Sequence, residues 1–503
     1  MYVLLLFGAL ASILASMFLS GTASVNNLVN WQSPIVNKLG WLGSSKPLPS
    51  TSVPANWNGF GYLFNITVGT PPQSLTVLSD WAWVTLFARS ARCEGRYDPA
   101  HCVAAGQSYF DERASTSYSN QTTLPRLRWD TSLYSPDFTV NYATDTVCIN
   151  HPDNTSHICT TPSTTIQVSD FPFAGHYVPP VPFGGIFGLA PVIPGLNATY
   201  HPTHYQAWKQ GRAGAQIGFN SCAKLSSKRF CHGGDAKFVF GGTDPALYDT
   251  DQVIWYPIVT PPWLGDEMFL PIKPSIWNFW ATRWTGGWIV ETEPRPNGEK
   301  RWWSSSSSSP TNYAVPFPAT ALNKDFLPAD HRDRTFRRGS PRYNSTATAG
   351  GQPELITPLA VLDDGSEGLG VPVTARQYTE LVRLTGGRKA DASTRAAIAA
   401  QWTSSTTGMA TQDWYVIDCA TDGRPELVYE FDRRGNYSVG AEEYVQKIYE
   451  TGECYLNAHV WEHSRTESGD ATVISVGDGI LKGLYVVLDF ERNVFGLAPL
   501  KRV

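Results

Sequence analysis

Two short apolar runs end in aspartate: Leu-Thr-Val-Leu-Ser-Asp at residues 75–80 and Leu-Ala-Val-Leu-Asp at residues 359–363. Each run has the aliphatic character of a buried strand. A carboxylate at the end of a buried strand is unfavourable unless it is paired or used in chemistry. Asp80 and Asp363, one in each half of the chain, therefore predict a duplicated fold that brings the two carboxylates together.

Each run is followed, later in its own half, by an apolar segment that contains glycine. Phe-Gly-Gly-Ile-Phe-Gly-Leu-Ala at residues 183–190 follows Asp80, and Ile-Ser-Val-Gly-Asp at residues 474–478 follows Asp363. A glycine at such a place allows another backbone to approach closely. The repeated order of elements supports the duplication.

The composition predicts an ordered, loop-rich and mostly β protein. The chain has 503 residues, of which 42% are hydrophobic and 17% charged, with 43 glycines and 36 prolines. This length allows two or more domains. The net charge of −5 lacks the basic excess typical of nucleic-acid binding. The clearest helical pattern runs from Ala375 to Leu384.

The N-terminal segment and the cysteines indicate a secreted chain. An apolar run over residues 1–19, followed by small residues, predicts a signal peptide over residues 1–23; an uncleaved membrane anchor is the alternative. Eight cysteines in close pairs predict four local disulfides, since zinc ligation would need two-residue spacings and nearby histidines. The pairs are Cys93/Cys102, Cys148/Cys159, Cys222/Cys231 and Cys419/Cys454. Glycosylation sequons begin at Asn65, Asn120, Asn154, Asn197, Asn344 and Asn436.

Changes in composition divide the rest of the chain. Residues 24–57 are polar and are predicted to be a short pro-like or linker segment. Residues 58–258 and 259–503 are predicted to be the two halves of the fold. Residues 286–351, with six consecutive serines, several prolines and a run of arginines, predict a disordered insert. A retained intron in the gene model would give the same composition.

The ordered motifs resemble those of the pepsin-like aspartic proteases from about residue 59 to residue 503, apart from the insert. The matching motifs are the Gly-Thr-Pro-Pro-Gln turn at residues 69–73, Ile-Phe-Gly-Leu-Ala at 186–190, Phe-Gly-Gly-Thr-Asp at 240–244 and the segment 360–372, which aligns with the second catalytic loop. The resemblance implies a bilobal pepsin-like acid protease fold, with two pseudo-symmetric β-rich lobes and a cleft between them. It implies a monomer that binds an extended peptide or protein, without metal, cofactor, nucleic acid or a stable membrane span.

The resemblance also implies roles for individual residues. Asp80 and Asp363 would be the catalytic dyad, in which two close carboxylates share one proton and activate a water molecule. Trp129 would stand at the aromatic position of the flap. Gly365 and Ser366 would contact substrate from the second catalytic loop.

The catalytic loops depart from the family pattern, and two hypotheses follow. Asp80-Trp81-Ala82-Trp83 replaces Asp-Thr-Gly-Ser, so Trp81 is expected to overfill a buried junction and Ala82 to crowd the aspartate. Asp364 adds negative charge beside the dyad. Either the chain is an acid endopeptidase, secreted or delivered to a lysosomal lumen, or it is an inactive pepsin-fold homologue that binds peptides or proteins. An artefact in the gene model around residues 81–84 is a third possibility.

Overall fold

The computed structural model describes most of the chain from residue 48 onward. The described residues are 48–58, 61–93, 109–121, 141–153, 155–169, 183–193, 197–259, 279–290, 313–314, 320–321, 355–356, 359–363, 370–401, 413–460 and 473–501. Residues 48–503 form one compact unit. The predicted signal peptide, residues 24–47 and most of the predicted insert lie outside the described residues.

The largest described sheet contains 15 strands and includes residues from both halves of the chain. Its order is β13-β29-β28-β11-β12-β1-β2-β3-β10-β4-β9-β6-β5, with β7 paired to β2 and β8 paired to β7. The strands are β1 Thr51–Trp57, β2 Tyr62–Val68, β3 Gln73–Asp80, β4 Leu86–Arg89, β5 Ser119–Asn120, β6 Asn141–Asp145, β7 Val147–Asn150, β8 His157–Cys159, β9 Thr164–Ser169, β10 Gly185–Gly188, β11 Gln216–Ser221, β12 Ala236–Phe240, β13 Ile254–Pro257, β28 Leu484–Asp489 and β29 Val494–Pro499.

Strand β1 places residues 51–57, the end of the predicted pro-like or linker segment 24–57, in the main sheet. The strand pairs antiparallel with β12 and continues onto β2. Val53 and Ala55 are buried, whereas Ser52 and Pro54 alternate with them on the less buried face. Residues 51–57 include polar side chains because only one face of the strand contacts the core.

The other described sheets are built from the second half of the chain. A six-stranded sheet has the order β23-β22-β14-β18-β27, with β15 paired to β14, and the smaller sheets are β16-β17, β19-β26 and β20-β21-β25-β24. The strands are β14 Ala281–Val290, β15 Tyr313–Ala314, β16 Thr320–Ala321, β17 Leu355–Ile356, β18 Leu359–Leu362, β19 Val371–Val373, β20 Arg388–Lys389, β21 Tyr415–Ile417, β22 Glu426–Phe431, β23 Gly435–Val439, β24 Val445–Lys447, β25 Cys454–Leu456, β26 Ala458–Val460 and β27 Val473–Val476.

Strand β14 also corrects the start of the predicted insert, residues 286–351. The strand continues to Val290, pairs with β22 over its second half and buries Ile289. The apolar residues that follow Gly286 therefore belong to the sheet, and an insert cannot begin before residue 291.

Helices are short and few among the described residues. The α-helices are α5 Thr203–Lys209, α7 Ala375–Thr385, α8 Ala392–Gln401, α9 Ala441–Tyr444 and α10 Asp478–Leu481, and the 3₁₀ helices are η3 Ala198–Tyr200, η4 Lys228–Cys231 and η5 Thr250–Gln252. Helix α7 confirms the predicted helical pattern. It begins with a capping box, in which Thr374 and Gln377 exchange hydrogen bonds, and it ends at Gly386 in the left-handed conformation.

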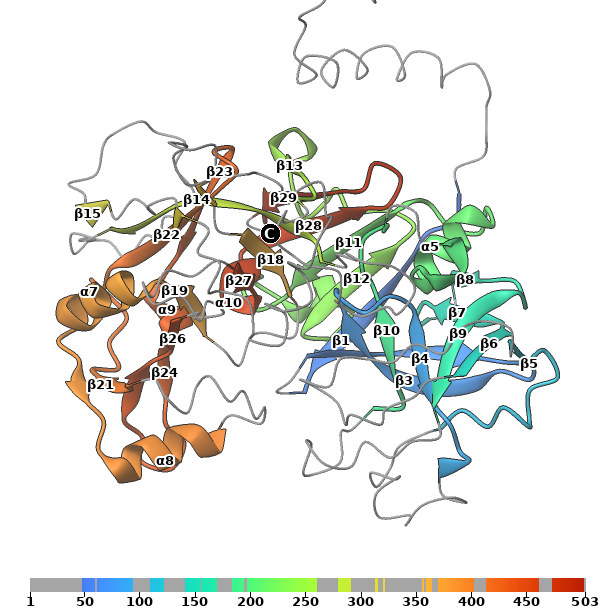
Figure 1. Cartoon of the computed structure of the whole chain (residues 1–503), viewed down its shortest axis with the longest axis horizontal. Helices are drawn as coiled ribbons and strands as arrows, with labels where there is room; N and C mark the ends of the chain where they lie inside the picture. The colour runs from blue at the N-terminus through green and yellow to red at the C-terminus, as the bar shows by residue number, and fades with distance from the viewer. Residues whose placement is uncertain are drawn as a thin grey trace, which may run out of the picture. The chain divides into compact units, whose positions relative to one another are not determined.

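The last two strands of the chain complete the sheet that contains the first half. Strand β28 pairs antiparallel with β11, and β29 pairs with both β28 and β13. In Figure 1 the red strand β28 lies beside the green strand β11. The shared sheet holds aromatic side chains such as Phe219 and Phe238, whose ring centroids are 4.9 Å apart. The sheet therefore joins strands from the two ends of the chain, such as β11 and β28.

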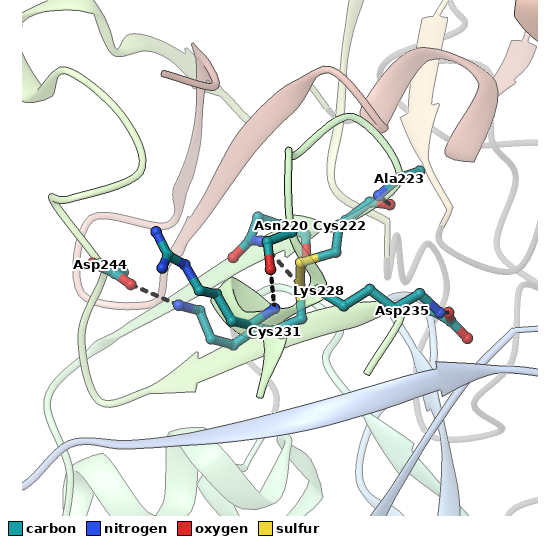
Figure 2. The surroundings of a disulfide bond; sticks show 11 residues. Asn220, Cys222, Ala223, Lys228, Cys231, Asp235 and Asp244 are labelled. Atoms are coloured by element: carbon teal, nitrogen blue, oxygen red, sulfur yellow. Dashed lines mark hydrogen bonds and ion pairs between the residues drawn. A yellow bond between two sulfur atoms is a disulfide. The ribbon is translucent and has the colours of Figure 1, made fainter. Parts of the chain in front are cut away.

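Three of the four expected disulfides are present within the described residues: Cys148–Cys159, Cys222–Cys231 and Cys419–Cys454. Cys93 is also disulfide-bonded, while Cys102 lies outside the described residues. Figure 2 shows the Cys222–Cys231 bond at the end of β11, where Asn220 Nδ2 lies 3.5 Å from Cys231 Sγ. This disulfide closes the loop between β11 and β12.

The four sequon asparagines within the described residues all have exposed side chains: Asn65, Asn120, Asn197 and Asn436. Asn65 projects from the exposed face of β2, so the strand itself does not bury it. A search of the described helices finds none with the length and apolar character needed to cross a membrane.

Candidate active site

The two predicted aspartates lie at equivalent ends of two parallel strand pairs. Strand β3 pairs in parallel with β10, with Asp80 opposite Gly188. Strand β18 pairs in parallel with β27, with Leu362 opposite Val476. The N–H of Asp363 then donates to the Val476 carbonyl at 3.1 Å, which continues the second pair by one residue. The backbone frame is therefore the same around both carboxylates.

The carboxylate of Asp80 is held by its own loop. The backbone N–H groups of Ala82 and Trp83 both donate to Asp80 Oδ1, at 2.8 Å and 3.0 Å. Such donors stabilise the ionised form and fix the orientation of the carboxylate. Ala82 itself is partly exposed.

The surroundings of Asp80 raise its pKa. Burial raises the pKa of Asp80 from its ordinary 3.8 to about 6, and repulsion from the nearby Asp363 carboxylate adds to the increase. The two backbone N–H donors act in the opposite direction and do not cancel the loss of hydration. The residue keeps a small solvent-exposed surface, but its carboxylate lies deep enough for desolvation to be the largest effect. The charge of Asp363 therefore reaches the Asp80 carboxylate and acts on its pKa.

Trp81 fills the core beneath the loop and does not overfill it. The side chain is fully buried, and its ring packs edge to face against Phe219 of β11, with centroids 5.2 Å apart at 87°. Tyr62 of β2 packs against the same phenylalanine at 5.3 Å. The large ring fits because it extends into the aromatic core of the 15-stranded sheet, where such edge-to-face pairs are favourable.

The Trp83 side chain is fixed by a buried amide. Its indole N–H donates to Gln167 Oε1 at 3.1 Å, and Gln167 Nε2 donates to the Tyr142 hydroxyl at 3.0 Å. All three side chains are buried. The side chain that replaces the expected serine therefore supports Asp80 indirectly, by holding the backbone N–H that contacts the carboxylate.

Gly188 allows the loop to fold closely over β10. A Cβ atom at this position would lie 2.3 Å from the Trp83 carbonyl oxygen and 2.5 Å from the Thr85 carbonyl oxygen. The same two carbonyls accept hydrogen bonds from Ala190 and from Gly188 itself. Glycine is required here because the side chain of any other residue would separate these bonded backbones.

The loop next to Asp363 is tied to the first half by a buried hydrogen bond. Asp478, two residues after Val476, accepts from the Tyr62 hydroxyl at 2.6 Å, and Lys482 lies 3.8 Å from the same carboxylate. Tyr62 belongs to β2, the neighbour of the Asp80 strand. This contact fixes the start of α10 against the sheet that carries Asp80.

A family model described as eukaryotic aspartyl protease matches residues 61–271 and 359–500 of the chain. The chain belongs to the eukaryotic aspartyl protease family. The two matched segments include both aspartate strands and leave out residues 272–358, which contain the predicted insert. Membership in this aspartyl protease family implies a peptide substrate.

Similar aspartyl proteases occur in fungi. The chain is 48% identical over 453 residues to a secreted aspartic protease named LUC8 from a Fusarium species, covering 90% of this chain and 91% of that relative. It is 42% identical over 457 residues to a secreted aspartic protease named FUS4 from Gibberella moniliformis, covering 90% and 91%. It is 26% identical over 468 residues to an aspartic protease-like protein named pytH from Aspergillus terreus, covering 89% and 92%.

The aspartyl protease fold brings Asp80 and Asp363 together, but other predicted site residues lie outside the described residues. Those residues are Trp129, Gly365 and Ser366, and Asp364 also lies there.

Sequence reasoning missed three residues that support Asp80: Phe219, Gln167 and Tyr142. Gln167 had a weak signal, because it stands between Ile166 and Val168, and a glutamine on a buried strand must find hydrogen-bond partners. Phe219 and Tyr142 had none, since their contacts with the loop depend on pairing between distant strands.

Proposed function

We propose that the protein is an aspartic endopeptidase in which Asp80 and Asp363 hydrolyse a peptide bond with an activated water molecule. The observation that carries the proposal is the matched placement of the two aspartates: they end equivalent parallel strand pairs. Burial raises the pKa of Asp80 to about 6, and the charge of Asp363 adds to the increase. The substrate would be an extended peptide or protein in a cleft between two lobes.

The chemistry requires one proton on the pair. One ionised carboxylate takes a proton from water while the water oxygen attacks the carbonyl carbon of the substrate. The other carboxyl group donates its proton to the carbonyl oxygen, which gives a tetrahedral diol. When the diol collapses, the C–N bond breaks and the proton taken from water passes to the departing nitrogen. The carboxylate that had donated its proton takes one back from a diol hydroxyl, which re-forms the C=O bond and restores the single proton of the pair. The raised pKa of Asp80 keeps one proton on the pair at acidic pH.

A second candidate function is peptide or protein binding without turnover. Trp81 and Trp83 favour it, because neither side chain supplies the hydroxyl group that the resemblance to pepsin-like enzymes would place near Asp80. Against it stand the two backbone N–H groups that orient the Asp80 carboxylate. These donors act through the main chain and tolerate the change of side chain.

Cleavage of an unfolded protein at acidic pH tests the proposal. We expect cleavage at about pH 4, inhibition by a peptide that mimics the tetrahedral intermediate, and a loss of at least about 1,000-fold in kcat/KM for Asp80→Asn and for Asp363→Asn. Asp489→Asn is the matched control, because Asp489 is a buried carboxylate that contacts Arg492 and Gln216 away from the dyad. Inhibitor binding without cleavage by the wild type would favour the binding homologue instead. Cleavage that persists in both dyad variants would exclude the mechanism.

We further propose that the chain is delivered to an acidic space outside the cytosol, by secretion or in a lysosomal lumen. The relatives named above as secreted aspartic proteases support this, as do the disulfides of the chain. Mass spectrometry of the protein recovered from culture medium tests it, through a mature N-terminus downstream of residue 23. Recovery only from cell extracts with an intact N-terminus would contradict it.

A further inference from the structure

A continuous path of hydrogen bonds joins the two aspartate strands through one tryptophan, Trp280. The Leu189 N–H donates to the main-chain carbonyl of Asp80 at 2.8 Å. The Trp280 indole N–H donates to the Leu189 carbonyl at 2.7 Å. The Leu362 N–H donates to the Trp280 carbonyl at 2.8 Å, and Leu362 directly precedes Asp363. Trp280 thus bonds both Leu189, which holds the Asp80 carbonyl, and Leu362, the residue before Asp363.

The path is well suited to holding a fixed geometry. Trp280 and Leu189 are fully buried, so water does not compete for these bonds. The Trp280 ring also packs edge to face against Phe490, with centroids 5.3 Å apart at 89°. The indole is a rigid donor with two rotatable bonds, and the other donors and acceptors belong to the main chain. Movement of one strand end is therefore transmitted to the other.

The hydrogen bonds of Trp280 join the two aspartate strands, and none of them needs a side-chain hydroxyl next to Asp80. Trp81 occupies the position after the aspartate and packs into the core against Phe219. Its side chain supplies apolar contact there and cannot accept a hydrogen bond from the opposite loop. The Trp280 path connects the two loops by a route that is independent of this substitution.

We propose that Trp280 is a positioning residue for the dyad, whose indole N–H and carbonyl together fix the separation and orientation of Asp80 and Asp363. The inference rests on the endopeptidase activity proposed above. Both carboxylates must reach the same water molecule and the same substrate carbonyl, so a small relative displacement lowers the rate of the chemical step more than it weakens substrate binding.

The variant Trp280→Phe tests the proposal, because phenylalanine keeps an aromatic ring beside Phe490 and removes the indole donor. Trp284→Phe is the matched control. Trp284 is also fully buried on the same stretch of chain, and its indole also donates to a carbonyl, at 2.8 Å, but that carbonyl belongs to Gly286 within the same strand. We expect Trp280→Phe to lower kcat by about 10-fold or more with KM within about 2-fold, and Trp284→Phe to change kcat by less than about 2-fold.

A titration separates this inference from the proposed activity. The pH dependence of the unfolding free energy, measured with and without Asp80→Asn, gives the pKa of Asp80 in each tryptophan background and needs no turnover. We expect a lower pKa of Asp80 in Trp280→Phe than in Trp284→Phe, because carboxylates that separate repel less. Wild-type protein that neither cleaves peptides nor binds the inhibitor would refute the activity alone. Equal pKa values of Asp80 in the two variants would overturn the role of Trp280, as would equal losses of kcat.

Discussion

The strand that ends at Asp80 and the strand that ends at Asp363 share a backbone arrangement, and within the described ranges, which stop at Asp363 and resume at Gly370, side-chain anchors are seen only around the first. Each belongs to a parallel pair and reaches its aspartate in the same register. Around Asp80, two tryptophans anchor the loop, one in the aromatic core and one on a buried glutamine. Asp363 is held through a main-chain bond to Val476.

This difference shows that the frame of a duplicated fold can persist while the support of one site residue is replaced. Parallel pairing depends on main-chain hydrogen bonds, which any side chain permits. Side-chain support depends on which residues fill the adjacent core. Substitution at Trp81 and Trp83 therefore changed the packing around Asp80 without moving its strand out of register.

The largest expected effect is on the aromatic anchor of the Asp80 loop, which a threonine at position 81 would remove. Trp81→Thr removes a fully buried ring from the contact with Phe219 and leaves a cavity, so we expect the free energy of unfolding to fall by about 4 kcal/mol. Urea denaturation measures the change. Trp81→Phe is the control and should lose less than half as much, because it keeps an aromatic ring in the cavity. A threonine variant as stable as the wild type would show that Trp81 does not anchor the loop.

The next largest expected effect is on the pH dependence of stability, which measures how far burial raises the pKa of Asp80. Its pKa in the folded protein, about 6, exceeds its ordinary 3.8, so protonated Asp80 stabilises the fold fully below about pH 3.8, and this contribution is lost as the pH rises through about 6. We expect the free energy of unfolding of the wild type to fall by about 2 kcal/mol across this interval relative to Asp80→Asn. Thermal or urea unfolding at several pH values measures the difference. Parallel curves for the two proteins would contradict the raised pKa.

The smallest expected effect concerns the amide beneath Trp83. Gln167→Met removes the acceptor for the Trp83 indole and the donor to Tyr142, and we expect a loss of about 1 kcal/mol in the free energy of unfolding. Once the indole is released, the backbone N–H of Trp83 holds the Asp80 carboxylate less firmly, so the pKa of Asp80 should increase further. The pH dependence of unfolding measures both effects.

The control for that variant is Gln206→Met. Gln206 is another buried glutamine, and its amide bonds the backbone of Thr165 and His201 and not the Trp83 indole. It should lower stability without moving the pKa of Asp80. If both variants move that pKa equally, the link through Trp83 is absent.

Local sequence patterns predicted the elements that depend on local chemistry. Helix α7 follows from the helical pattern over residues 375–384, and both aspartates follow from apolar strands that end in a carboxylate. The register that aligns Asp80 with Asp363 follows from the family resemblance.

Long-range pairing could not be read from the same patterns. Strand β1 looked like a polar linker because its partner β12 lies far along the chain. Trp81 was expected to overfill a junction because nothing nearby in sequence reveals that Phe219 offers it an aromatic pocket. The residues that support Asp80 could therefore be identified only from the tertiary structure.

The late position of β28 and β29 in the chain has a consequence for biosynthesis. Strand β11 lies between β12 and β28, and β13 pairs with β29. A nascent chain that has emerged only as far as residue 480 holds the complete Asp80 strand, yet β11 has an open edge and β13 has no partner among the described strands. The half that carries Asp80 thus finishes its sheet only after residues 484–499 leave the ribosome. Folding of both halves is then coupled to the completion of synthesis.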